Sequence, residues 1–100
     1  SGLLFAQSGT LKGKVTDAKT KEAIGFANVL VMQGGQNIGG TMTDIDGNYT
    51  VKPIPAGRVN VKVLYMGYQP LQYNNIIITP GKTTYQNFKI KATAQMLKAV

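Results

Sequence analysis

The chain has four acidic side chains, and two of them have the spacing of metal ligands. Asp44, Asp46 and Asn48 occupy positions 1, 3 and 5 of a segment that imitates the start of a calcium-binding loop. The rest of an EF-hand is missing, because tyrosine and proline stand where that motif needs glycine and glutamate. A looser calcium site stays open, but the pattern favours a tight turn in which the aspartates bond their own backbone and Gly47 supplies a positive φ. We therefore expect no bound metal.

The composition gives nucleophilic catalysis no support. Histidine and cysteine are absent, which excludes thiol nucleophiles, Ser–His pairs and zinc sites built from these residues. The serines, Ser1 and Ser8, lie near the N-terminus. Residues 81–83 resemble the end of a phosphate-binding loop, but Ile76 replaces the first glycine of that motif. We therefore predict no catalytic residue, no cofactor and no enzymatic activity.

A strip of aromatic and amide side chains is the remaining candidate for ligand contacts. Tyr73, Asn74 and Tyr85 could contact a sugar or a peptide, since aromatic rings stack on such ligands and amides bond them. The alternative interpretation, which the pattern favours, is that these side chains fill the core or the loops.

The chain is strongly basic, with 11 Lys and Arg residues against four acids and a formal net charge of +7. Three lysine pairs have i, i+2 spacing, which places both charges on one face of a strand; they are Lys12 with Lys14, Lys19 with Lys21, and Lys89 with Lys91. These pairs predict solvated outer faces of sheets, where lysine also protects edges against aggregation. Nucleic-acid sites use arginine heavily, and Arg58 is the one arginine here, so we expect no nucleic-acid partner.

The 100 residues suffice for one domain, and the hydrophobic pattern has a period of two. The clearest strand is 58–65, where Val59, Val61, Val63 and Tyr65 are expected to face inward. The apolar run 27–32 predicts a central strand packed on both faces, and further strands are expected at 76–78 and 84–91. About seven short strands separated by turns predict an all-β fold, an antiparallel β-sandwich. No apolar run is long enough for a membrane-spanning helix, so the domain itself is not expected to span a membrane.

The two ends differ from this pattern. Residues 1–9 are interpreted as the remnant of a tag and a signal peptide, or as a flexible tail, with an edge strand as the alternative. Residues 10–91 form the predicted domain. Residues 92–100 are interpreted as an exit segment toward a further region of the chain, in which Thr93 could cap a short helix.

Several motifs occur in an order that resembles a known family; they are Gly13–Asp17, Ala27–Val29, Gly40–Tyr49, Pro55–Gly57 and Tyr65–Tyr68. Together they resemble the carboxypeptidase regulatory-like domain, and the resemblance implies a transthyretin-like (prealbumin-like) Greek-key sandwich of seven strands. The Gly-Tyr pair at 67–68 resembles the version found in the N-terminal extension of TonB-dependent, SusC-like outer-membrane receptors of Bacteroidetes. One departure is Ile24-Gly25-Phe26, where many receptor versions have Pro-Gly.

The resemblance implies structural roles, without catalysis, for seven signature residues: Asp44, Asp46, Gly47, Tyr49, Gly57, Gly67 and Tyr68. The glycines would permit turns, the two aspartates would brace a hairpin, and the tyrosines would pack in the core. On these grounds we expect Asp46→Ala to destabilise the fold.

The implied function is that of an accessory or interaction domain in an exported protein. It would lie at the periplasmic face of the outer membrane or at the cell surface, as the N-terminal domain of a receptor for nutrient uptake. Its partner would be a periplasmic protein or the rest of its own receptor chain. The alternative is a stand-alone exported module that binds a carbohydrate or a peptide.

Overall fold

The computed structural model describes residues 7–94, and its regular structure is all β. The strands are β1 (Ser8–Asp17), β2 (Asn28–Gln33), β3 (Gln36–Met42), β4 (Asn48–Pro55), β5 (Gly57–Leu64), β6 (Leu71–Ile78), β7 (Thr83–Tyr85) and β8 (Phe88–Ile90). Within the described range, no helix has the length and hydropathy needed to cross a membrane. The predicted fold class is confirmed.

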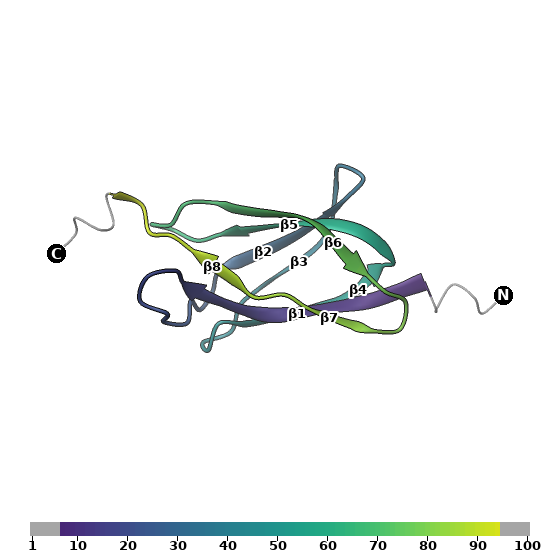
Figure 1. Ribbon diagram of the computed structural model, residues 1–100, viewed down its shortest axis with the longest axis horizontal. Helices are drawn as coiled ribbons and strands as arrows, with labels where there is room; N and C mark the ends of the chain where they lie inside the picture. The colour runs from purple at the N-terminus through teal and green to yellow at the C-terminus, as the bar shows by residue number, and fades with distance from the viewer. Residues whose placement is uncertain (1–6, 95–100) are drawn as a thin grey trace.

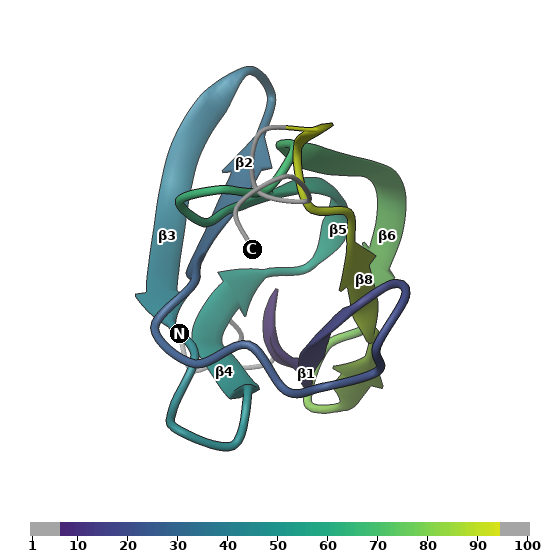
Figure 2. The same cartoon turned by 90° about the vertical axis from the view of Figure 1, so that its left-hand side faces the viewer.

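The strands form two sheets that pack face to face (Figures 1 and 2). One sheet has the order β4-β1-β7, with β8 pairing farther along β1, and the other has the order β3-β2-β5-β6. The chain changes sheet after β1, β3, β4 and β6, whereas β2 and β3, β5 and β6, and β7 and β8 follow one another within a sheet. The β1–β2, β3–β4 and β5–β6 connections lie at the end of the sandwich from which the C-terminal segment leaves (Figure 2).

The core follows directly from the alternation of side chains along each strand. Val59, Val61 and Val63 of β5 face inward as predicted and are at most 1% exposed. The opposite sheet contributes Leu11 and Val15 of β1 and the stacked rings of β4 and β8. The core residues share almost complete burial and come from both sheets: Leu11, Val15, Ile24, Ala27, Val29, Val31, Tyr49, Val51, Ile54, Val59, Val61, Val63, Ile76, Ile78, Phe88 and Ile90.

The last predicted strand, 84–91, is divided into β7 and β8, and both run parallel to β1. The sandwich is therefore mostly, but not wholly, antiparallel. The division has a local cause: at Asn87 the side-chain oxygen, in place of a main-chain carbonyl, accepts the hydrogen bond from Lys14 N–H (2.9 Å). This exchange interrupts the ladder of main-chain hydrogen bonds along β1, so two short strands, β7 and β8, pair with it in place of one.

Two predictions about side-chain direction are wrong. In the run 27–32, Val29 and Val31 are buried, but Leu30 and Met32 lie half-buried on the outer face of their sheet. β2 is central within its sheet, yet no described segment covers that outer face. Tyr65 is 37% exposed, because β5 ends at residue 64 and the chain turns there, with Tyr68 N–H bonded to the Tyr65 carbonyl.

Two boundaries also differ from prediction. β1 begins at Ser8, which pairs with Pro55, so the first sheet starts inside the segment interpreted as a tail. β6 covers 71–78 rather than 76–78, and Asn75 has a positive φ of 65° where the register with β5 shifts. The tag and signal interpretation of residues 1–6 and the exit interpretation of 95–100 concern residues outside the described range.

Candidate binding surfaces

The turn at 44–48 is the tight turn that the sequence predicts. The Asp44 side-chain Oδ1 accepts hydrogen bonds from the N–H groups of Asp46 and Asn48, each at 2.9 Å. Gly47 has a φ of 82°, and a Cβ on it would lie 2.7 Å from the Val15 carbonyl oxygen. Asp46 is exposed, and its carboxylate bonds no described residue, so Asp44 alone braces the hairpin. The expected destabilisation by Asp46→Ala is corrected accordingly.

The described residues contain no group of three or more His, Cys, Asp or Glu side chains that could hold a metal ion. The loose calcium site considered at Asp44 and Asp46 has two carboxylates, and one of them already bonds the backbone of its own turn.

A buried carboxylate, which the sequence analysis missed, links two connections. Asp17 is 7% exposed. Its Oδ1 accepts from the N–H groups of Lys19 (2.8 Å) and Thr20 (2.9 Å), and its Oδ2 accepts from the Tyr68 hydroxyl at 2.6 Å. The Tyr68 hydroxyl and the two backbone donors lower the pKa of Asp17 to about 2. The same bond, with burial, raises the pKa of Tyr68 to about 12. Near neutral pH, Asp17 is therefore ionised and Tyr68 is protonated, which is the state in which the hydroxyl donates to the carboxylate.

Tyr68 and its neighbour Gly67 also hold the chain as it leaves the sandwich. Tyr68 forms an isolated bridge with Ala92, and the Gly67 carbonyl accepts from Thr93 N–H at 2.9 Å. Gly67 has a φ of 85°, which favours glycine at this turn. Gly57, at the turn from β4 to β5, has a φ of 130°. The signature glycines thus occur at turns.

Tyr49 fixes the junction between β7 and β8 from inside the core. Its ring stacks on Phe88 with centroids 5.8 Å apart, and its hydroxyl donates to the Gln86 carbonyl at 2.5 Å. Burial raises its pKa above the usual range. Gly13 lies under the same carbonyl, and a Cβ there would overlap the Gln86 oxygen. The junction is therefore held tightly against β1.

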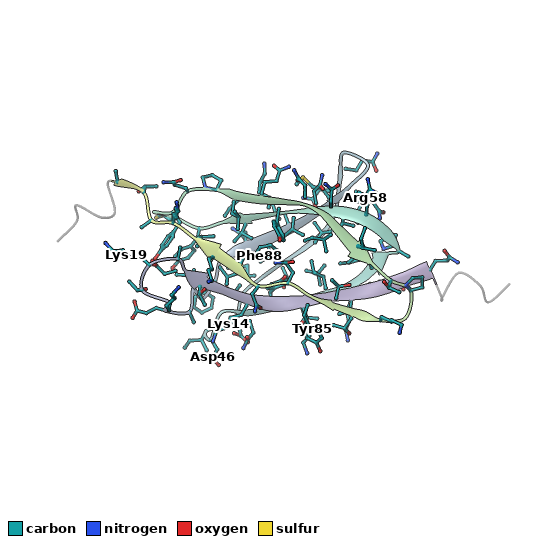
Figure 3. All side chains as sticks on the ribbon, in the orientation of Figure 1. Lys14, Lys19, Asp46, Arg58, Tyr85 and Phe88 are labelled. Carbon is teal, nitrogen blue, oxygen red and sulfur yellow. The ribbon has the colours of Figure 1, made fainter. Side chains whose placement is uncertain are left out.

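The outer face of the β4-β1-β7/β8 sheet gathers basic and aromatic side chains. Lys12 and Lys14 alternate outward along β1, Lys12 pairs with Tyr85 of β7, and Thr16 pairs with Lys89 of β8. Lys52 faces outward from β4. We call Lys12, Lys14, Lys52, Tyr85 and Lys89 the lysine–tyrosine face. Figure 3 shows Lys14 and Tyr85 on one side of the sandwich and Arg58 on the opposite side.

Two open hollows lie on or beside this face. The larger, about 540 Å³, is lined by Lys12, Lys14 and Tyr85 together with the polar side chains of Asn48 and Asn87. The smaller, about 370 Å³, shares Lys14 and Asn87 and adds Lys89 and Tyr73. Lys14 and Asn87 line both hollows, so the two lie side by side, and together we call them the track.

The predicted ligand contacts are thus divided. Tyr85 is 73% exposed and Tyr73 is 45% exposed, and they line neighbouring parts of the track. The Tyr73 ring also packs edge-on against Phe88, with centroids 5.7 Å apart, so its position is fixed by the core. Asn74 lines neither hollow, and its side-chain oxygen accepts from Gln72 at 3.0 Å. The sequence analysis did not join the lysine pairs to the tyrosines, although the i, i+2 spacing was a usable indication.

The sequence of 10–91 matches the family described as the carboxypeptidase regulatory-like domain. The match covers most of the chain and all eight strands except the first two residues of β1, so the chain belongs to this family. No curated protein matches the chain significantly.

Solved structures share the fold at low identity. A 5-hydroxyisourate hydrolase of Klebsiella pneumoniae has a TM-score of 0.67 and 17% identity over 86% of this chain and 92% of that one. The TIE protein of Bacillus anthracis has a TM-score of 0.67 and 20% identity, with 87% of this chain but 17% of that chain covered. A putative carbohydrate-binding protein of Bacteroides uniformis has a TM-score of 0.68 and 16% identity over 82% and 40% of the two chains. The chain thus matches a small part of some of these proteins and nearly the whole of another.

Proposed function

We propose that this chain is a non-catalytic interaction domain of an exported, outer-membrane-associated protein, the periplasmic N-terminal domain of a TonB-dependent receptor for nutrient uptake. Family membership supports an accessory role, and the receptor context rests on the resemblance of the Gly67–Tyr68 motif. The titratable groups with shifted pKa values are the buried Asp17 and Tyr49 and the half-buried Tyr68, and all three make hydrogen bonds that stabilise the fold.

One observation carries the interaction role: β3 is an edge strand whose second half, 39–42, is regular and unprotected, since the irregularity in its pairing with β2 lies at Ile38. It lies at the margin of its sheet (Figure 2) and contains neither charge nor proline over 36–42. Exposed edges offer unpaired N–H and C=O groups to an added strand, and proteins usually blunt them with lysine, proline or bulges.

The free backbone groups of β3 can be assigned. The hydrogen bond from Thr43 N–H to the Ala27 carbonyl (2.9 Å) directs the backbone of Thr43 toward β2. Because alternate residues of a strand bond to opposite sides, Thr41 also faces β2, while Gly40 and Met42 direct N–H and C=O to the free edge. There the Met42 carbonyl accepts one long hydrogen bond, from the Thr41 hydroxyl at 3.4 Å, and keeps a second lone pair for a partner strand. A partner strand would therefore bond Gly40 and Met42.

The other margins of the two sheets are less open, and the one formed by β7 and β8 consists of strands of only three residues each. β4 contains Lys52, Pro53 and Pro55, with a cis bond before Pro53. β6 is interrupted by Asn75, and the Thr84 hydroxyl bonds the Ile77 carbonyl at 2.9 Å. β3 is accordingly the edge that best fits strand addition.

The test places a photoreactive residue at position 42 on β3 or, as the control, at position 52 on β4, in cells that produce the parent protein. We expect one major protein adduct from position 42 and none from position 52, with a partner protein or another region of the parent chain in the adduct. Equal adducts at both positions, or none, would contradict strand addition at β3.

The receptor context has a separate test, which is the reading frame around this chain. A signal peptide upstream and a TonB-dependent transport domain downstream are the expected findings. A frame that ends shortly after Val100 would overturn the receptor context and favour a small exported module that binds a carbohydrate or a peptide.

A further inference from the structure

We propose that the lysine–tyrosine face binds an anionic polysaccharide, a glycan that carries carboxylate or sulfate groups. This inference concerns the sheet opposite β3 and does not depend on strand addition. The ligand would lie along the two neighbouring hollows and contact the side chains that line them.

The first support is the arrangement of charge. Lys12 and Lys14 are adjacent outward residues of β1, roughly 7 Å apart along the strand. Lys52 and Lys89 flank them on the neighbouring strands, so four ammonium groups share one face. A flexible ammonium is a point charge that suits anions presented at several positions.

The second support is that acidic side chains are kept away from this face. One acid, Asp17, ends β1 with its side chain buried, and the others lie in the connections before β2 and β4: Glu22, Asp44 and Asp46. Asp44 lines one end of the larger hollow, and its carboxylate bonds its own turn. An anionic ligand along the track thus meets repulsion at one end only.

The third support is the non-ionic part of the track. The exposed Tyr85 ring is held beside Lys12 by the β1–β7 register, where it can stack on the C–H face of a sugar ring. Asn87 is oriented because its side-chain oxygen accepts from Lys14 N–H, which leaves its NH₂ group as a donor. Asn48 and Thr50 add polar groups on β4. Such a set of one ring with surrounding amides and cations fits a charged sugar chain.

The same features favour a glycan over a nucleic acid. Sheet surfaces that bind single strands stack several successive bases on several exposed rings. Here Tyr85 is the exposed ring over the lysines, since Tyr73 lies farther along the track with its ring against Phe88. The face also carries lysines and no arginine.

The test measures binding of heparin hexasaccharide by calorimetry at 50 mM and 300 mM salt. The double variant Lys12→Gln/Lys14→Gln is compared with Arg58→Gln/Lys62→Gln, which removes the same charge from the other sheet. We expect the first pair to weaken binding about tenfold or more and the second less than twofold. Binding should also weaken as the salt concentration rises.

Tyrosine variants separate stacking from charge. Tyr85→Ala should weaken binding about fivefold, whereas Tyr85→Phe, which keeps the ring, should change it less than twofold. Thermal melts of all variants confirm folding, which is expected because Lys12, Lys14, Arg58 and Tyr85 are exposed and Lys62 is half-buried on an outer face.

Several results would overturn the proposal. They are equal losses from the two double variants, equal affinity for an uncharged galactan hexasaccharide, or no heparin binding at 1 mM ligand. Tighter binding of oligothymidine or polyglutamate than of heparin at the same salt concentration would assign the face to a nucleic acid or an acidic peptide instead.

Discussion

At the scale of single residues, the side chains that look chemical serve the fold. Asp17, Asp44 and Tyr49 each bond backbone groups with their side-chain oxygens, and Asp17 also accepts from the Tyr68 hydroxyl. Polar groups that are buried or that form turns need such partners. Asp17 joins the β1–β2 connection to the β5–β6 connection, Asp44 holds the turn before β4, and Tyr49 holds the β7–β8 junction. Asp46, two residues from Asp44, makes no such side-chain bond to a described residue, and this difference between the two aspartates can be measured.

Asp44→Ala removes an acceptor used by two backbone N–H groups, whereas Asp46→Ala removes an exposed carboxylate. We expect the first variant to lower the free energy of unfolding by about 1–2 kcal/mol and the second by less than about 0.5 kcal/mol. Urea denaturation of the two variants checks this. Equal losses would contradict the assignment of the brace to Asp44.

The Asp17–Tyr68 pair predicts the response to pH. Because the pKa of Asp17 falls from 3.8 to about 2 on folding, its stabilising contribution is present above pH 4 and is lost as the pH falls from about 4 to 2. The pKa of Tyr68 rises from 10.0 to about 12, so its contribution is complete below pH 10 and is lost between about pH 10 and 12. Thermal melts across these windows measure both effects.

The matched variants are Asp17→Asn and Tyr68→Phe. Asp17→Asn should flatten the acid window. Tyr68→Phe should make the acid window narrower and should reduce, without abolishing, the alkaline loss, because burial also raises the pKa of Tyr49. If the melting temperatures of the parent chain and of both variants changed in parallel with pH, the pair would not be the titrating element.

At the scale of elements, the β7–β8 junction decides how the last strands attach. Tyr49→Phe leaves the buried Gln86 carbonyl without its side-chain donor, which should cost about 1–2 kcal/mol. Gly13→Ala places a methyl group against the same backbone, which cannot move as a side chain would, so its cost should be larger. Chemical denaturation ranks the two variants. A smaller loss of unfolding free energy for Gly13→Ala than for Tyr49→Phe would contradict this, because it would show that the backbone at Gln86 can move away from the added methyl group.

The sequence predicts elements well where one strand repeats a simple pattern. The alternation of β5 identifies its buried valines because the side-chain period of a strand is two. Pairing is nonlocal and was harder to predict: the parallel pairing of β7 and β8 with β1 joins residues more than 70 positions apart. Likewise, Asp17 reads as part of a polar connection, and its burial depends on a tyrosine 51 residues away.

The candidate binding surfaces were also predictable only in part from the sequence. Tyr73 and Tyr85 could be selected from sequence as ligand contacts, and the lysine pairs could be placed on outer faces. Their meeting on one track depends on the register of β1 with β7 and β8, which no local pattern reveals. The open edge of β3 likewise depends on which strand ends each sheet.

At the scale of the whole molecule, the sandwich presents two kinds of surface. One sheet has an uncharged edge at β3, and the other has a basic outer face with an exposed tyrosine. A domain that joins others through an edge strand while a separate face meets a charged ligand fits an accessory role. The central claim is that β3 is paired when the domain is in its parent protein.

Hydrogen exchange tests that claim most directly. We would compare the exchange of peptides from β3 (36–42) and β4 (48–55) in this isolated chain and in the parent protein in outer-membrane vesicles. We predict that the amides of Gly40 and Met42 exchange rapidly in the isolated chain and slowly in the parent protein, while exchange in β4 is unchanged. Equal exchange of β3 in the two samples would contradict the account.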